Sequence, residues 1–198
     1  LQAERDRLAE EVFHDLLEND EMRFMVVAND LGLRLPTKIA VPPGEKRATR
    51  LDGNQFVLSL FEHVPEDSMN SLEHQVASYL DEQENLFFWY RNASRRDYSV
   101  QGWKRGRIFA DFIFTASREH TEPDDPFHDV FVVETKGLHL KLNADTNYKR
   151  SVFNLCTDRA KKREWSELVP AMQNKTMRFE VVDEDEWQAR LNQLLGAN

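Results

Sequence analysis

The sequence predicts an α/β fold in which a mixed central sheet is flanked by helices. The order of the expected elements from about residue 67 is helix, three strands, helix, strand, helix. The last strand follows a helix rather than a turn, and this arrangement is typical of an α/β sandwich with a mixed sheet. The 198 residues are 40% hydrophobic and 31% charged, which is ordinary for one soluble globular core.

Residues 1–60 are expected to form an N-terminal extension, separate from a domain of residues 61–198. Residues 2–18 carry apolar side chains at helical spacing and predict a charged amphipathic helix. The segment that follows is broken by several prolines and glycines, which favour short extended pieces. The chain begins at Leu1 rather than at methionine, and we expect it to belong to a longer polypeptide.

The first helix of the main domain is expected over residues 69–83, "MNSLEHQVASYLDEQ", with Ser68 as its N-cap. Its apolar residues recur at helical spacing and form one face. A helical projection places Glu73 inside this apolar arc rather than opposite to it. Glu73 is therefore expected to point at the core or at a cleft beside it.

Three strands rich in aromatic and β-branched residues are expected next, separated by a basic loop and by a polar loop that contains prolines. They are "NLFFWYRN" (85–92), "RIFADFIFTA" (107–116) and "DVFVVETKG" (129–137). A helix over about 145–163, the strand "MRFEVVDE" (177–184) and a helix over about 185–195 complete the domain.

Two of these strands carry charges that a buried strand rarely tolerates without a partner. Asp111 interrupts one apolar strand, and Glu134 ends the next with Lys136 two residues later. Residues two apart on a strand face the same side, so Glu134 and Lys136 project together, and pairing of the two strands brings Asp111 beside Glu134. With Glu73, this set predicts a Mg²⁺ site, where Mn²⁺ can substitute, and a lysine that orients or deprotonates water.

An Asp followed by Glu-x-Lys on adjoining strands, with an acidic helix in front, resembles the PD-(D/E)XK nuclease superfamily. The segments "NSLEHQVASYLDEQ", "QGWKRGRIFADFIF" and "VVETKGLHL" are similar to the C-terminal endonuclease domain of type III restriction enzyme Res subunits and related DEAD/DEAH-box helicases. The likeness covers about residues 55–195. It departs from the motif at Ala110, which replaces a proline that has no side-chain role at the metal.

The resemblance implies a restriction-endonuclease-like αβββαβ core and a metal-dependent DNA endonuclease. By this likeness Asp111 and Glu134 are metal ligands, Lys136 is the catalytic lysine, and Glu73 is an ancillary metal or water ligand. It also implies a place beside a helicase or translocase motor in restriction or phage defence. The chain lacks the G-x-x-x-x-G-K-[ST] phosphate loop of such a motor, so the motor is expected outside this chain or in a partner.

The charge distribution favours an anionic partner in spite of a net charge of −9. Lys and Arg concentrate in two runs, 91–107 and 136–163, on either side of the charged strands. The candidate DNA contacts are Arg91, Gln101, Lys104, Arg107 and Lys149. Cutting both DNA strands with one metal centre per chain needs two chains or two visits, so a dimer is one possible active form.

Several classes of protein are excluded by the same sequence. No apolar run reaches the roughly 18 residues of a membrane span, and the charged N-terminus lacks the apolar centre of a signal peptide. The single cysteine, Cys156, cannot form an internal disulfide, and no Cys/His spacing is typical of zinc. We therefore expect a cytoplasmic protein without a membrane partner.

Two alternatives to an active nuclease remain open. A nuclease-fold module without catalysis would bind DNA or dock a partner through the basic runs. A purely structural interaction domain would do neither, and Asp111, Glu134 and Lys136 would then form a buried ion-pair cluster. Metal binding and salt-sensitive DNA binding distinguish these interpretations.

Overall fold

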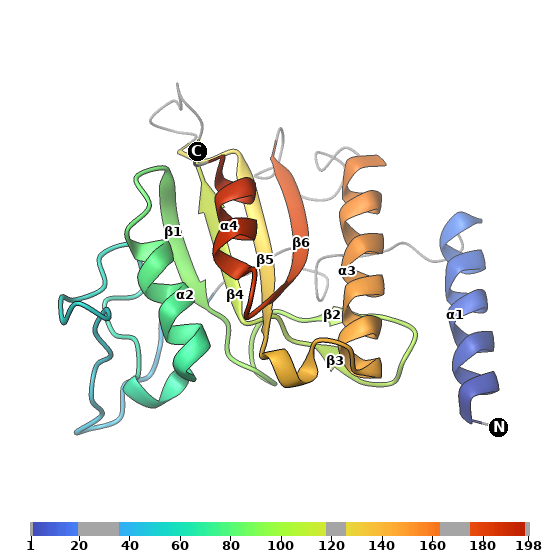
Figure 1. Ribbon diagram of the computed structural model, residues 1–198, viewed down its shortest axis with the longest axis horizontal. Coiled ribbons are helices and arrows are strands. Elements are labelled where there is room, and N and C mark those ends of the chain that lie inside the picture. Colours follow the sequence, from blue (N-terminus) through green and yellow to red (C-terminus); the bar gives the residue numbers. More distant parts are fainter. Residues whose placement is uncertain (1, 20–35, 118–125, 163–174, 197–198) are drawn as a thin grey trace.

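The computed structural model describes residues 2–19, 36–117, 126–162 and 175–196, with only the backbone of residues 160–162. In the described part a four-stranded sheet lies between helices (Figure 1). Its strands are β1 (Leu86–Arg91), β4 (Phe112–Ala116), β5 (Asp129–Lys136) and β6 (Thr176–Asp183), in the order β1-β4-β5-β6. Adjacent strands run antiparallel except β5 and β6, which are parallel. This mixed sheet confirms the predicted α/β class.

The side chains of β5 divide between two hydrophobic cores because successive residues of a strand face opposite sides. Val130 and Val132 pack with α3 (Ala144–Lys162). Phe131 and Val133 pack in the second core, to which two helices contribute. These helices are α2 (Ser71–Asp81) and α4 (Trp187–Leu195). The alternation therefore directs Glu134 and Lys136 towards α3 and Thr135 towards the α2 side.

The predicted strand 107–116 is wrong in one respect, because the structure divides it into two strands in different sheets. Its start is β3 (Arg107–Ile108), which pairs with β2 (Val100–Gln101) in a small hairpin, and its end is β4. Between them the buried Asn92 side chain donates to the carbonyl oxygens of Ala110 (2.8 Å) and Tyr98 (2.9 Å). A side chain thus takes the place of a neighbouring strand just before Asp111.

The start of α2 also differs from the prediction. Asn70, not Ser68, is the N-cap: its side chain accepts from the Glu73 amide, and the Glu73 carboxylate accepts from the Asn70 amide, which forms a capping box. Ser68 instead ends a short 3-10 helix, η1 (Glu66–Ser68), and its hydroxyl donates to the Pro65 carbonyl oxygen at 2.7 Å. The cap places Glu73 in the first turn, at the end of α2 nearest the polar cluster described below.

The core continues across residue 60, where the sequence predicts a domain boundary. Phe56 and Val64 are buried in the same core as α2. The Asp81 carboxylate of α2 accepts hydrogen bonds of 2.8–3.0 Å from the amides of Val57 and Leu58. Residues 56–64 therefore pack in one core with α2.

Helix α1 (Gln2–Glu18) confirms the predicted N-terminal helix, but most of its side chains are not buried. Leu17 is its one side chain classed as buried, whereas Leu8 is 48% and Val12 54% exposed. Phe13 meets Trp103 of the β2–β3 hairpin with ring centroids 5.9 Å apart. Within the described ranges, no helix is long and apolar enough to cross a membrane.

Candidate active site

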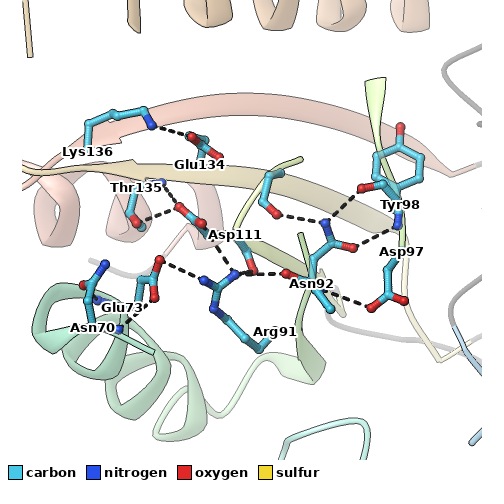
Figure 2. A network of polar contacts seen from close by, with 12 residues as sticks. Asn70, Glu73, Arg91, Asn92, Asp97, Tyr98, Asp111, Glu134, Thr135 and Lys136 are labelled. Atoms are coloured by element: carbon cyan, nitrogen blue, oxygen red, sulfur yellow. Dashed lines mark hydrogen bonds and ion pairs between the residues drawn. The ribbon is translucent and has the colours of Figure 1, made fainter. Parts of the chain in front are cut away.

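Charged side chains from four elements gather where β1, β4 and β5 come together near the first turn of α2 (Figure 2). Glu73 comes from α2, Arg91 ends β1, Asp111 precedes β4, and Glu134 and Lys136 end β5. In Figure 2, Asp111 lies between the Glu73–Arg91 pair and the Glu134–Lys136 pair. The predicted residues thus share one region, but an arginine lies among them.

Asp111 is fixed in one orientation by the strand beside it. Its amide donates to the Val133 carbonyl oxygen at 3.0 Å, which continues the β4–β5 ladder by one residue. Its Oδ2 accepts from the Thr135 amide at 2.7 Å and from the Thr135 hydroxyl at 2.8 Å. Its Oδ1 is approached by Arg91 Nη1 at 3.4 Å, beyond a good hydrogen bond. One carboxylate oxygen is therefore held by β5 while the other retains free acceptor capacity.

Arg91 lies between two carboxylates rather than reaching for solvent. Its guanidinium pairs with Glu73 at 2.8 Å and donates to the carbonyl oxygens of Asn92 (3.0 Å) and Asp111 (2.8 Å). Burial raises the pKa of Glu73, an effect that Arg91 opposes and that repulsion from Asp111 increases. Glu73 thus has both oxygens engaged, one by Arg91 and one by the Asn70 amide.

Glu134 is shared by two lysines. Its Oε1 accepts from Lys136 Nζ at 2.5 Å and from Lys149 Nζ, on α3, at 2.7 Å. Its Oε2 is buried and has no hydrogen-bond partner among the described residues. Burial and repulsion from Asp111 raise the pKa of Glu134. Burial lowers the pKa of Lys149, but the charge and hydrogen bond of Glu134, together with the charge of Asp145, outweigh burial and leave that pKa raised.

The other predicted DNA contacts lie on the β2–β3 hairpin. Gln101 Nε2 donates to the carbonyl oxygens of Gly102 (3.0 Å) and Lys104 (2.6 Å), so this side chain braces the hairpin itself. The Lys104 ammonium lies 4.5 Å from the ring centroid of Tyr148 on α3. Arg107 is exposed in β3. Of the hairpin candidates, Lys104 and Arg107 present cations and Gln101 does not.

The hairpin is anchored to α3 by a close backbone contact. A Cβ atom on Gly102 would lie 2.5 Å from the Tyr148 hydroxyl oxygen and 2.6 Å from a Val152 methyl group, so only glycine allows this approach. Trp103 adds an edge contact to the Tyr148 ring, with centroids 5.0 Å apart. The basic hairpin is thus tied to the helix that supplies Lys149.

Of the three carboxylates predicted to bind a divalent cation, two have an oxygen that is available to it. Within the described ranges no three His, Cys, Asp or Glu side chains already converge as a metal-binding group. Mg²⁺, however, commonly uses only one or two carboxylates and keeps several waters. Glu134 Oε2 is buried without a partner, and Asp111 Oδ1 has only the 3.4 Å approach of Arg91. Asp111 and Glu134 thus offer oxygens, whereas those of Glu73 are occupied.

Thr135 is a site residue that the sequence interpretation passed over. It is the middle residue of Glu-Thr-Lys and is 7% exposed. A hydroxyl beside a charged motif is a weak signal, and only the bend of the chain before β4 brings Asp111 within its reach. Successive side chains of a strand point to opposite faces, so Glu134 and Lys136 share one face of β5 and Thr135 lies on the opposite face.

Comparisons with protein families, curated proteins and solved structures gave no significant match to this chain. The observations that bear on its function are therefore the geometry and the charges of the site itself.

Proposed function

We propose that this chain is a metal-dependent DNA endonuclease domain of the PD-(D/E)XK type. The single observation that carries the proposal is the end of β5, where Glu134 keeps a buried oxygen without a partner beside Lys136, and Asp111 adjoins it from β4. Unsatisfied buried carboxylate oxygens are costly in a purely structural cluster and suit a cation-binding site. Type III restriction endonuclease domains are the relatives that the sequence motifs favour.

The order of the elements supports this fold. Leaving the small hairpin aside, the chain runs α2, β1, β4, β5, α3, β6, which is the expected αβββαβ order. The first three strands are antiparallel neighbours and β6 is reached through α3, parallel to β5. Asp111 lies just before the start of β4, and Glu134 and Lys136 lie at the end of the antiparallel β5, so the motif residues share one edge of the sheet.

In this proposal each residue of the chain has a separate task. Asp111 and Glu134 hold a Mg²⁺ ion, which when bound polarises the phosphodiester and lowers the pKa of a coordinated water. Lys136 Nζ donates to Glu134 at 2.5 Å as an ammonium group, so it orients the attacking water and stabilises the negative charge that develops there, while the proton of the water passes to solvent. Thr135 fixes Asp111, and Glu73 acts indirectly through Arg91 rather than as a metal ligand.

The substrate and the partners follow from the charges and the motifs. Exposed Arg107 and the Lys104 ammonium on the hairpin provide sites for backbone phosphates of DNA. A helicase or translocase, in a longer chain or a partner subunit, would supply movement along DNA. Two copies of the site are needed to cut both strands at once, and restriction or phage defence is the role that fits such an assembly.

A second candidate function is a DNA-binding or docking module without catalysis. It is favoured by Arg91, which neutralises Glu73 and Asp111 in the absence of a metal. In that case the hairpin would bind DNA, but divalent cations would neither bind at Asp111 nor promote cleavage. Metal binding and cleavage therefore separate the two candidates.

The experiment is cleavage of supercoiled and linear DNA with Mg²⁺ by the parent protein, Asp111→Asn and Lys136→Met. We expect both variants to lose at least about a hundredfold in rate, since each removes a group that acts on the reacting atoms. Lys46→Met is the matched control, because the Lys46 side chain is 78% exposed, and it should cut like the parent. Melting curves establish that each variant is folded. Equal rates for the parent, Asp111→Asn and Lys136→Met would overturn the proposal.

A further inference from the structure

Lys136 and Lys149 bring two ammonium groups to one carboxylate oxygen from different elements. Lys136 ends β5, and Lys149 lies in the second turn of α3. Both donate to Glu134 Oε1, at 2.5 and 2.7 Å. Their side chains are only 11% and 18% exposed. A single buried carboxylate thus faces two largely buried cations.

The charges around this pair leave an excess of positive charge. Besides Glu134, Lys149 pairs with Asp145, one turn earlier on α3, at 3.5 Å. Asp145 is 64% exposed, so solvent weakens its attraction. Asp111 acts on Glu134 by repulsion and is itself engaged by Thr135. Buried ammonium groups need more compensation than one shared oxygen provides, and an anionic ligand would supply it.

We propose that Lys149 and Lys136 form an anion site that takes a phosphate group of a nucleic acid backbone. This inference deepens the proposed nuclease function and rests on it for the identity of the ligand. Lysine is a common phosphate ligand because its compact ammonium has three donors and each of these lysines uses only one on Glu134 Oε1. Lys149 is therefore a substrate-binding residue of the same standing as Lys136.

The position of Lys149 extends this anion site towards the hairpin. Tyr148, its neighbour on α3, accepts the cation of Lys104 on its ring and a hydrogen bond of 3.2 Å from the Lys104 amide. The hairpin and the lysine pair are thus held by adjacent residues of one helix.

The test measures binding of a short labelled DNA duplex by fluorescence anisotropy in EDTA, where no cleavage occurs. For Lys149→Gln we expect a three- to tenfold loss of affinity and a salt dependence reduced by about one phosphate contact. Lys149→Arg should bind like the parent, and so should Lys46→Gln. Inorganic phosphate should compete with DNA less well in Lys149→Gln than in the parent. Unchanged affinity and salt dependence in Lys149→Gln would overturn the inference.

Glu134→Gln should change DNA affinity in the opposite direction from Lys149→Gln, and it provides a second test if Lys149→Gln does not fold. Removing the carboxylate charge frees both ammonium groups, so DNA affinity in EDTA should rise severalfold. A fall or no change would contradict the anion site. Because no metal or cleavage enters this assay, its result is separate from that of the nuclease test: a protein that never cuts DNA can still show both shifts.

Discussion

The candidate site consists of two halves with opposite charge excess. The acidic half, on the α2 side, holds two carboxylates, Glu73 and Asp111, and one guanidinium, Arg91. The basic half, on the α3 side, holds one carboxylate, Glu134, and two ammonium groups, Lys136 and Lys149. The two halves lie on opposite faces of β5. Thr135 points towards the acidic half, whereas Glu134 and Lys136 point towards the basic half.

This difference shows how one short strand end can serve two ligands of opposite charge. A cluster built only for stability would balance its charges on each side, since uncompensated buried charge is costly. Here Asp111 Oδ1 of the acidic half and the unpartnered Glu134 Oε2 of the basic half are available to a cation, and the two ammonium groups of the basic half have donors for an anion. Asp111 connects the halves, because its charge raises the pKa of both Glu73 and Glu134. A metal and the phosphate it activates are such a pair of ligands.

The largest expected effect comes from removing the cation of the acidic half. Arg91→Met leaves Glu73 and Asp111 without their shared partner, and loss of one member of a buried ion pair costs about 3–5 kcal/mol. Chemical denaturation in EDTA measures this loss. Mn²⁺ should restore a larger part of the stability in Arg91→Met than in the parent, because a bound cation replaces the guanidinium.

A surface arginine provides the control for that experiment. Arg190 pairs with Glu180 through two hydrogen bonds of 3.0 Å but is 43% exposed, so Arg190→Met should cost less than about 1 kcal/mol and respond to Mn²⁺ like the parent. Equal losses of stability in Arg91→Met and Arg190→Met would show that the acidic half does not depend on the Arg91 guanidinium.

The next effect isolates the orientation of Asp111. Thr135→Val keeps the shape of the side chain but removes the hydroxyl that donates to Asp111 Oδ2 at 2.8 Å. We expect Mn²⁺ affinity, measured by calorimetry, to fall about tenfold, the usual effect of losing a group that orients a metal ligand. Thr135→Ser retains the hydroxyl and should bind Mn²⁺ like the parent. Equal affinities for the Val and Ser variants would assign Thr135 a packing role only.

The hairpin cations are expected to act on DNA and not on metal. Lys104→Ala and Arg107→Ala should each weaken DNA binding about two- to fivefold and reduce the salt dependence by about one contact. Mn²⁺ affinity should not change, since neither residue is one of the proposed metal ligands, Asp111 and Glu134. Lys46→Ala, at an exposed position far along the chain, is the control. A loss of metal binding in either hairpin variant would contradict the claim that these cations act on DNA alone.

The smallest effect is a pH dependence of stability. The pKa of Glu73 is raised in the folded state, so the ionised carboxyl opposes folding above its usual pKa, and this cost disappears as the pH falls and the group is protonated. Glu73→Gln lacks the cost at every pH. In EDTA the melting temperature of the parent, relative to that of Glu73→Gln, should therefore rise as the pH falls from neutral towards pH 5. A relative melting temperature that falls on acidification would contradict the raised pKa.

The sequence was sufficient to predict the strands of the sheet and α2, because the strands are rich in aromatic and β-branched residues and α2 has apolar residues at helical spacing. It also predicted that Glu134 and Lys136 face the same side, which follows from the alternation along β5 alone. The break between β3 and β4 was missed, since Ala110 and Asp111 continue an apolar run and the Asn92 side chain that replaces a strand partner lies far away in the sequence.

The division of the site into halves was equally hidden from the sequence. Arg91 was predicted to contact DNA because it lies in a basic run, but its position at the end of β1 places its guanidinium against Glu73. The sequence predicts Lys149 as a DNA contact together with the hairpin residues, but only the packing of α3 on β5 brings its ammonium group to Glu134. Local patterns identify elements, whereas these pairings depend on how the elements pack.

The most direct test of the two halves is a calorimetric Mn²⁺ titration of the parent, Asp111→Asn and Lys149→Gln side by side. The parent should bind Mn²⁺ through Asp111 and Glu134, and Asp111→Asn should lose this binding because an amide is a poor substitute for the carboxylate. Lys149→Gln should bind Mn²⁺ at least as tightly as the parent, since it removes a cation that competes for Glu134. Unchanged binding in Asp111→Asn, or equal losses in both variants, would contradict a site in which Asp111 and Glu134 bind the metal and Lys149 binds the phosphate.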